Sequence, residues 1–131
     1  MLTIIRGIPG SGKTTLALQM NTDQSKVHVE ADMFFMEDGV YVYDANRIKK
    51  AHQWCFEQTE KALQEGKNVI VSNTFVKRWE VDPYLELAKK HNAPSEILVC
   101  EGNYKSIHNV PEEVIQRMKN SWENFDKESD V

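Results

Sequence analysis

The chain has 131 residues, of which 40% are hydrophobic and 27% are charged, and these fractions are typical of a folded globular protein. The 20 acidic and 16 basic residues give a net charge of −4, which argues against a general nucleic-acid coat, because such proteins bind phosphates through Lys and Arg. We expect one domain over residues 1–131, with an acidic tail that frays from about residue 126.

Membrane and metal-binding signals are weak in this sequence. No stretch approaches the roughly 20 apolar residues that a membrane-spanning helix needs, and no signal peptide is visible. We therefore expect a cytoplasmic protein without a membrane partner. Cys55 and Cys100 are far apart and lack the spacing of a metal site, so we interpret both as reduced core thiols. We expect no metal other than Mg²⁺.

In chain order, the first predicted elements are a short apolar strand at residues 2–6 and a helix from near residue 12 to residue 20. An alternating segment at residues 27–30 predicts a second strand, and residues 37–39 predict a turn. A long helix is expected from Asp44, its N-cap, to about residue 65, because Gly66 follows and apolar side chains recur at helical spacing.

The second half of the chain continues this alternation. Residues 69–71 and 97–100 are predicted strands, and a helix is expected from Asp82 and Pro83 to about residue 91. Pro111 is expected to open the last helix. Strands that alternate with helices predict an α/β domain with a mostly parallel sheet of about four strands, covered by helices on both faces.

Residues 7–14 have the sequence G-I-P-G-S-G-K-T, a complete G-x-x-x-x-G-K-[S/T] phosphate-binding loop between a predicted strand and a predicted helix. Glycines let backbone amides curl around phosphates, Lys13 adds a point charge, and Thr14 offers a hydroxyl to Mg²⁺. We therefore expect ATP and Mg²⁺ as cofactors. The predicted nucleotide contacts are Gly7, Ile8, Pro9, Gly10, Ser11, Gly12, Lys13, Thr14 and Thr15.

Asp32 is the leading candidate for a second chemical role. It follows the predicted second strand, and in parallel sheets ligands bind beyond the carboxyl ends of the strands. A carboxylate there can accept the proton of an incoming hydroxyl. We assign Lys13 and Asp32 as the catalytic residues; the alternative for Asp32 is a helix or turn cap.

The sequence resembles the P-loop polynucleotide 5′-hydroxyl kinases, typified by the bacteriophage enzyme, and small ATP-binding kinases related to them. The shared motifs are G-x-P-G-S-G-K-T-T at 7–15, Asp32 followed by aromatic residues, Val-Ser-Asn-Thr at 71–74 and Val-Pro-x-x-Val-Ile-x-x-Met at 110–118. The resemblance covers nearly the full chain. It implies a single-domain P-loop kinase-like fold, with Asp32 as general base and Thr74 lining the acceptor cleft.

Three departures from that family affect its function. Met33 and Phe35 stand where the phage enzyme has a second Asp and a substrate-binding Arg, and Asn73 stands where an Asp follows the third strand. The amide of Asn73 adds no charge to a Mg²⁺ site. The third departure is the segment at residues 101–110, which lacks the arginines of kinase lids.

The remaining site candidates follow from these departures. Lys105 and His108 are candidate lid residues, and Arg117 is a candidate nucleotide contact; surface charge is the alternative for each. Asn73, Thr74 and Arg78 are candidate substrate contacts, although the basic pair at 77–78 is also typical of a solvated surface.

The function that these patterns favour is an ATP-dependent kinase that transfers the γ-phosphate to a hydroxyl acceptor. The acceptor is the 5′ end of an oligonucleotide or polynucleotide, or a small metabolite. Two alternatives stay open: a catalytically weak ATP-binding switch or partner-binding module, which the short lid and Asn73 favour, and a plain ATPase with water as acceptor.

Overall fold

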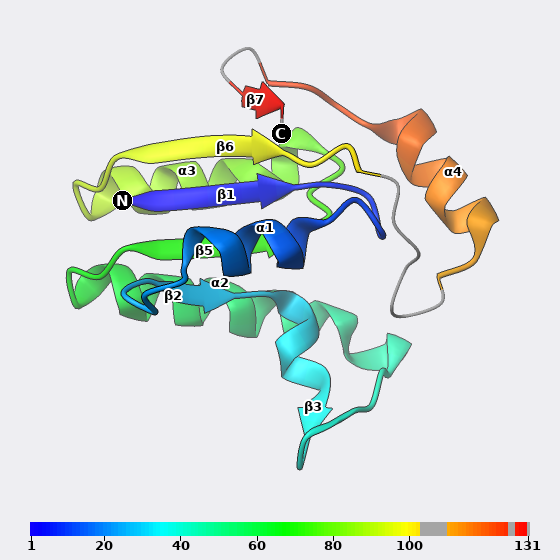
Figure 1. The fold of residues 1–131 in the computed structure, drawn as a ribbon, viewed down its shortest axis with the longest axis horizontal. Helices are drawn as coiled ribbons and strands as arrows, with labels where there is room; N and C mark the ends of the chain where they lie inside the picture. Colours follow the sequence, from blue (N-terminus) through cyan, green and yellow to red (C-terminus); the bar gives the residue numbers. More distant parts are fainter. Residues whose placement is uncertain (103–109, 126–127, 131) are drawn as a thin grey trace.

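Five parallel strands form the centre of the protein. The structure, a computed structural model, describes residues 1–102, 110–125 and 128–130 (Figure 1). The sheet has the order β2-β5-β1-β6-β7, and all four pairings are parallel. The predicted α/β class with a parallel sheet is therefore confirmed. The strands are β1 (Leu2–Arg6), β2 (Val27–Val29), β5 (Val69–Asn73), β6 (Ser95–Val99) and β7 (Glu128–Asp130).

Strand β1 lies in the middle of the sheet and pairs along its whole length with β5 and β6. Every residue of β1 and β5 is buried, which explains why both segments are rich in β-branched and apolar residues. In the register, Ile5 lies opposite Ser72 and Arg6 lies opposite Asn73. The segments that follow β1 and β5 therefore begin side by side at the carboxyl edge of the sheet.

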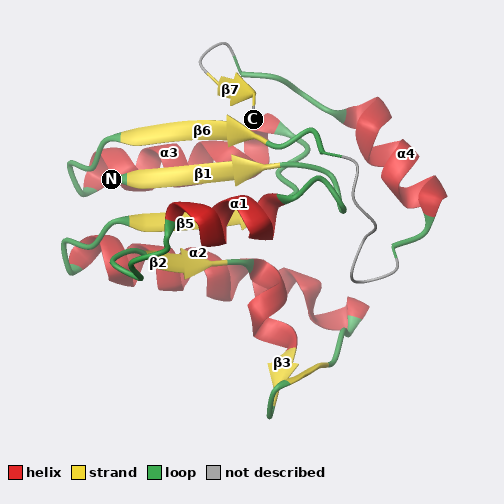
Figure 2. Ribbon diagram, in the orientation of Figure 1, coloured by secondary structure: helices red, strands yellow, loops and turns green. Residues whose placement is uncertain are grey.

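Helices cover both faces of the sheet, as predicted. Helices α2 (Ile48–Gln64) and α3 (Arg78–Lys90) lie behind it in Figure 2, and α1 (Lys13–Met20) lies in front. The larger core, which includes Cys55, packs between the sheet and α2 and α3. A smaller core of Ile5, Ala17, Ile70 and Cys100 packs under α1. Helix α4 (Glu112–Ser121) lies beyond the carboxyl ends of the strands (Figure 1).

Two helices differ at their starts from the sequence prediction. Helix α3 begins at Arg78, four residues before the predicted N-cap, and Pro83 lies inside it. The early start is supported by carboxylates, because the backbone N–H of Lys77 donates to Glu80 (2.8 Å) and that of Arg78 to Glu123 (2.9 Å). Before α2, a 3₁₀ turn, η2 (Ala45–Arg47), is capped by Asp44, as predicted.

The acidic tail also differs from the prediction. Instead of fraying, Glu128–Asp130 forms β7, which pairs in parallel with β6 so that Ile97 lies opposite Glu128. Without β7, one edge of β6 would leave a row of backbone N–H and C=O groups without partners, and this edge favours pairing even with an acidic segment. The sheet consequently has five strands rather than about four.

A small hairpin projects from the sheet after β2. A 3₁₀ helix, η1 (Ala31–Phe35), leads into this hairpin, and its two strands, β3 (Met36–Glu37) and β4 (Val40–Tyr41), pair antiparallel (Figure 1). Asp38 and Gly39, with φ of 49° and 80°, form the two-residue turn. In the described part of the chain no helix is both long and apolar enough to cross a bilayer.

Candidate functional site

The phosphate-binding loop connects the end of β1 to the start of α1. Gly10 and Gly12 have φ of 83° and 95°, values that favour glycine. A Cβ atom on Gly7 would overlap the Ser11 hydroxyl and lie 3.0 Å from the carbonyl oxygen of Cys100, so this position leaves no room for a side chain. The buried Ser11 hydroxyl has no hydrogen-bond partner among the described residues. This is the geometry of an anion cradle.

Lys13 begins α1 and is half-buried. Its ammonium donates a hydrogen bond to the carbonyl oxygen of Ile8 (3.1 Å), across the loop. Burial lowers the pKa of Lys13, and the nearby carboxylates of Glu30 and Asp32 oppose this effect. The structure therefore brings Lys13 and Asp32, the two residues predicted to be catalytic, to the same edge of the sheet, together with Glu30.

Thr14, the predicted Mg²⁺ ligand, faces Glu30, which follows β2. The Thr14 hydroxyl donates to Oε1 of Glu30 at 2.8 Å, and the Ser72 hydroxyl donates to the same oxygen at 2.7 Å. Nε2 of His28 lies 3.1 Å from it. Burial disfavours ionisation of Glu30, but the hydrogen bonds from His28, Ser72 and Thr14 outweigh burial and lower its pKa.

Asp32 lies in η1, which is attached to the sheet and to the hairpin. The backbone N–H of Ala31 donates to Oδ1 of Asn73 (2.9 Å), and this bond ties η1 to the end of β5. The Tyr41 hydroxyl of β4 donates to Oδ1 of Asp32 (3.2 Å). Burial and the Asp32 charge raise the pKa of Tyr41, so its hydroxyl stays protonated and keeps donating. The hairpin thus orients the Asp32 carboxylate.

Comparison with known proteins identifies the family. Residues 2–125 match the model of a protein family described as an AAA domain. The chain belongs to this AAA domain family. It is 30% identical over 138 aligned residues to human NEDD4-binding protein 2, an alignment that covers 95% of the chain but 8% of that protein. The chain thus spans less than a tenth of this relative's length.

Solved structures show the same fold. A sugar kinase from Janibacter sp. HTCC2649 has a TM-score of 0.67 at 21% identity, with 99% of this AAA domain and 82% of that chain covered. A chain of the Pnkp1/Rnl/Hen1 RNA repair complex has a TM-score of 0.62 at 21% identity, with 95% and 40% covered. The predicted P-loop kinase-like fold is therefore confirmed.

Two of the predicted substrate contacts, Asn73 and Thr74, lie at the end of β5. Asn73 is buried, and its amide donates to Sγ of Cys55 (3.5 Å) while its oxygen accepts the N–H of Ala31. Thr74 is half-buried, and its carbonyl accepts the Gly7 N–H (3.3 Å), so it lies beside the first residue of the loop. The proposed substrate contacts of Asn73 and Thr74 stay predictions.

Outside the phosphate-binding loop, the two predicted cationic contacts that the structure describes, Arg78 and Arg117, are both exposed. Arg78 is exposed at the start of α3, with its guanidinium 4.9 Å from the ring centroid of Phe125. Arg117 is exposed on α4. Lys105 and His108, the lid candidates, lie outside the described residues. A direct role for any of these four residues in nucleotide or substrate binding stays a prediction.

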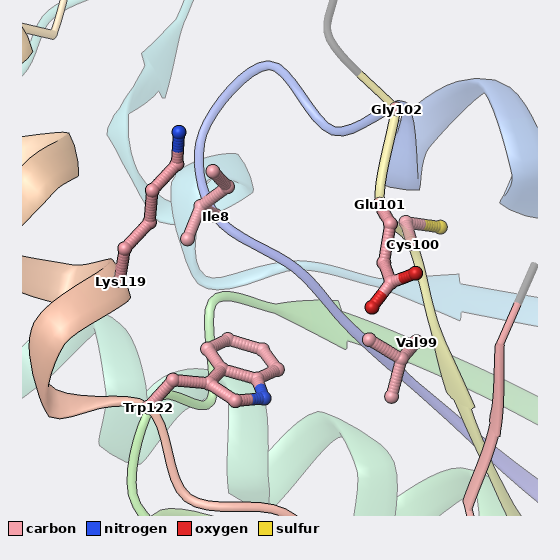
Figure 3. A pocket seen from close by; sticks show the side chains of 7 residues that line it. All are labelled: Ile8, Val99, Cys100, Glu101, Gly102, Lys119 and Trp122. Carbon is pink, nitrogen blue, oxygen red and sulfur yellow. The ribbon is translucent and has the colours of Figure 1, made fainter.

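A pocket of about 490 Å³ lies beside the phosphate loop (Figure 3). Ile8 brings the loop to this pocket, the end of β6 and the residues after it supply a second wall, and α4 with the residue after it supplies a third. Its volume is within the usual range for small-molecule sites, roughly 300–1,000 Å³. The lining residues are Ile8, Val99, Cys100, Glu101, Gly102, Lys119 and Trp122.

Behind the loop, a fully buried arginine joins three segments. Arg6 is the last residue of β1, and its Nε and Nη2 atoms donate to the carbonyl of Phe75 at 2.9 and 2.7 Å. Nη2 also donates to the carbonyl of Glu123 at 2.6 Å, and the guanidinium lies 4.3 Å from the ring centroid of Trp122. Arg6 thereby connects the base of the phosphate loop to the segment after α4.

Sequence reasoning missed Glu30 and the burial of Arg6. Both lie at the ends of predicted strands, where a charged residue is ordinarily solvated. The alternation at 27–30 indicated a strand but did not show that Glu30 faces Thr14, because that contact depends on where α1 lies relative to the end of β2.

Proposed function

We propose that this AAA domain is an ATP-dependent kinase that transfers the γ-phosphoryl group to a hydroxyl acceptor. The observation that carries the proposal is the juxtaposition of the phosphate cradle, Lys13 and Asp32 at one sheet edge. The carboxylates of Glu30 and Asp32 both raise the pKa of the Lys13 ammonium, against the larger effect of its burial, so each carboxylate stabilises this cation. Phosphoryl transfer depends mainly on such positioning of charges.

Each residue has a distinct part in the proposed reaction. The loop amides and Lys13 hold the β- and γ-phosphates, and Thr14 supplies a hydroxyl for Mg²⁺, which neutralises phosphate charge when bound. Asp32 takes the proton of the acceptor hydroxyl while the oxygen of that hydroxyl bonds to the γ-phosphorus. The bond from the γ-phosphorus to the oxygen bridging to the β-phosphate breaks, and ADP leaves with that oxygen.

The acceptor that we favour is the 5′ end of an oligonucleotide, with a small metabolite as the second choice. Tyr41, which donates a hydrogen bond to Asp32, stacks with Tyr43 at a distance of 6.5 Å between ring centroids, and Tyr43 is 55% exposed. Exposed aromatic faces are typical platforms for nucleobases. The resemblance to polynucleotide kinases and the fold shared with a chain of an RNA repair complex support this choice. The fold shared with a sugar kinase supports the second.

The test is a phosphoryl-transfer assay with ATP radiolabelled at the γ-phosphate, Mg²⁺, and a panel of 5′-OH RNA, 5′-OH DNA, nucleosides and sugars. We expect Lys13→Ala to lose ATP affinity. Asp32→Asn should keep ATP affinity within about twofold but lose at least about a hundredfold in transfer rate, as expected for a general base. Asp38→Asn, in the exposed turn of the hairpin, is the matched control and should behave as wild type.

The outcomes separate the candidate functions. Labelled acceptor supports the kinase, whereas phosphate release that no hydroxyl compound alters supports an ATPase. Tight ATP binding without either product supports a binding module. Wild-type transfer by Asp32→Asn would show that Asp32 is not the base.

A further inference from the structure

The end of β5 supplies no negative charge to the hydroxyl of Thr14. Ser72 is neutral, and the two polar atoms of the Asn73 side chain contact Ala31 and Cys55 instead. A Mg²⁺ site in a phosphoryl-transfer enzyme usually includes one or two carboxylates besides the phosphates and water. The structure places a different carboxylate at this point.

That carboxylate is Glu30, which reaches Thr14 from the end of β2. Its Oε1 atom contacts the hydroxyls of Thr14 (2.8 Å) and Ser72 (2.7 Å) and lies 3.1 Å from Nε2 of His28. The Glu30 side chain is 16% exposed, and in the described part of the chain no hydrogen bond reaches its second oxygen, Oε2. One oxygen is thus fixed by three neighbours, while the other is available to a ligand.

We propose that Glu30 is the carboxylate of the Mg²⁺ site, and that it replaces from β2 the charge that the end of β5 lacks. The inference rests on the nucleotide site of the proposed function but not on its acceptor. The hydroxyl of Thr14 and the carboxylate of Glu30 are hard oxygen donors, which Mg²⁺ prefers. Ser72 and His28 orient this carboxylate, as outer neighbours of metal ligands commonly do.

A purely structural role makes a different prediction. Glu30 also lies near the positive end of α1, where a carboxylate stabilises a helix, and it bonds the Thr14 side chain. If this were its whole role, removal of the charge would lower thermal stability without changing how Mg²⁺ affects ATP binding. The ratio of ATP affinities with and without Mg²⁺ therefore distinguishes the two roles.

The experiment measures the Kd of ATP by titration calorimetry in EDTA and in excess Mg²⁺, for wild type, Glu30→Gln and Glu96→Gln. Glu96 is the matched control, because it also accepts a hydrogen bond from a threonine, Thr3 (2.9 Å), but near the opposite ends of the strands. We expect Mg²⁺ to tighten ATP binding equally in wild type and E96Q. In E30Q this gain should fall by about tenfold or more, the usual effect of disturbing a metal site. The Kd of E30Q for ATP in EDTA should be equal to that of wild type or lower.

A second variant tests the placement of the charge. In Glu30→Gln combined with Ser72→Asp, the new carboxylate takes the position of a hydroxyl that lies 2.7 Å from Glu30, so most of the Mg²⁺ gain should return. If E30Q does not fold, Glu30→Asp replaces it; this change draws the carboxylate back by one methylene and should give a gain clearly below that of wild type.

Several results would overturn the inference. These are a wild-type Mg²⁺ gain in E30Q or E30D, a loss in E96Q as large as in E30Q, or no effect of Mg²⁺ on ATP binding by wild type. No result depends on phosphoryl transfer. A protein that shows the expected gains but phosphorylates no acceptor would refute the proposed kinase and leave the assignment of Glu30 intact.

Discussion

Replacement of Arg6 by methionine tests how strongly the base of the phosphate loop depends on one buried cation. Methionine has a similar length and apolar stem, so Arg6→Met removes the guanidinium while it keeps much of the packing. The carbonyl of Phe75 then loses both of its Arg6 donors, and that of Glu123 loses one. The carbonyl of Val76 also accepts from Arg6 but keeps the Glu123 N–H.

The expected loss follows from these groups. Each buried carbonyl left without its donor costs about 1–3 kcal/mol, and the cation–π contact with Trp122 adds about 1 kcal/mol. We therefore expect a loss of about 3–7 kcal/mol in the free energy of unfolding, out of a total of roughly 5–15 kcal/mol. For a chain of this length, that corresponds to a midpoint lower by about 10–25 °C.

Urea titration followed by circular dichroism measures this difference, and the slope of the transition shows whether unfolding stays two-state. Arg78→Met is the matched control, because Arg78 also lies over an aromatic ring, that of Phe125, but is exposed. It should change stability by less than about 1 kcal/mol. An R6M protein within about 1 kcal/mol of wild type would refute the reasoning, since the carbonyls would then have found other donors at little cost.

Three smaller changes give further predictions. Gly7→Ala places a Cβ 3.0 Å from the carbonyl of Cys100 and should destabilise the protein by about 1–3 kcal/mol in urea titration; wild-type stability would mean that the loop relaxes freely. Tyr41→Phe removes a hydrogen bond to Asp32 and should lower kcat about three- to tenfold with an unchanged KM for ATP, whereas an unchanged kcat would exclude this orienting role. Hydrogen bonds from His91 and Lys90, at the end of α3, lower the pKa of Glu60. Glu60→Gln should therefore lower the melting temperature at pH 7, and this difference should shrink as the pH falls below the ordinary pKa of 4.5 and vanish below the lowered pKa of Glu60; a difference that stays constant with pH would contradict it.

Most of the framework could be predicted from local sequence. The four strands of the core sheet and the helix before Gly66 carry strong apolar periodicity and clear end signals, and the structure contains each of them. The predicted start of α3 was wrong because Asp82 and Pro83 give a strong local signal for a helix start. The actual start depends on Glu123, which is distant in sequence. Strand β7 was missed because its pairing depends on the edge of β6 rather than on its own residues.

In the candidate site, too, the part formed by one contiguous segment could be predicted, whereas contacts between distant segments could not. The loop at residues 7–14 is a contiguous motif that can be found from the sequence, and Gly10 and Gly12 have the positive φ values for which such a motif uses glycine. The contact of Glu30 with Thr14 and Ser72 joins three separate segments, so no spacing in the sequence reveals it. The orientation of Asp32 likewise requires the hairpin that places Tyr41 beside it.

The central position of β1 has a consequence for the order of folding. Its partners β5 and β6 begin at Val69 and Ser95, and the carbonyl that Arg6 contacts in Glu123 lies 117 residues away. During synthesis, the segment that holds the phosphate loop therefore leaves the ribosome long before any strand that can flank it. We expect the loop to gain its shape late, in a slow step dominated by distant contacts, and nascent chains that end before β6 to bind no nucleotide.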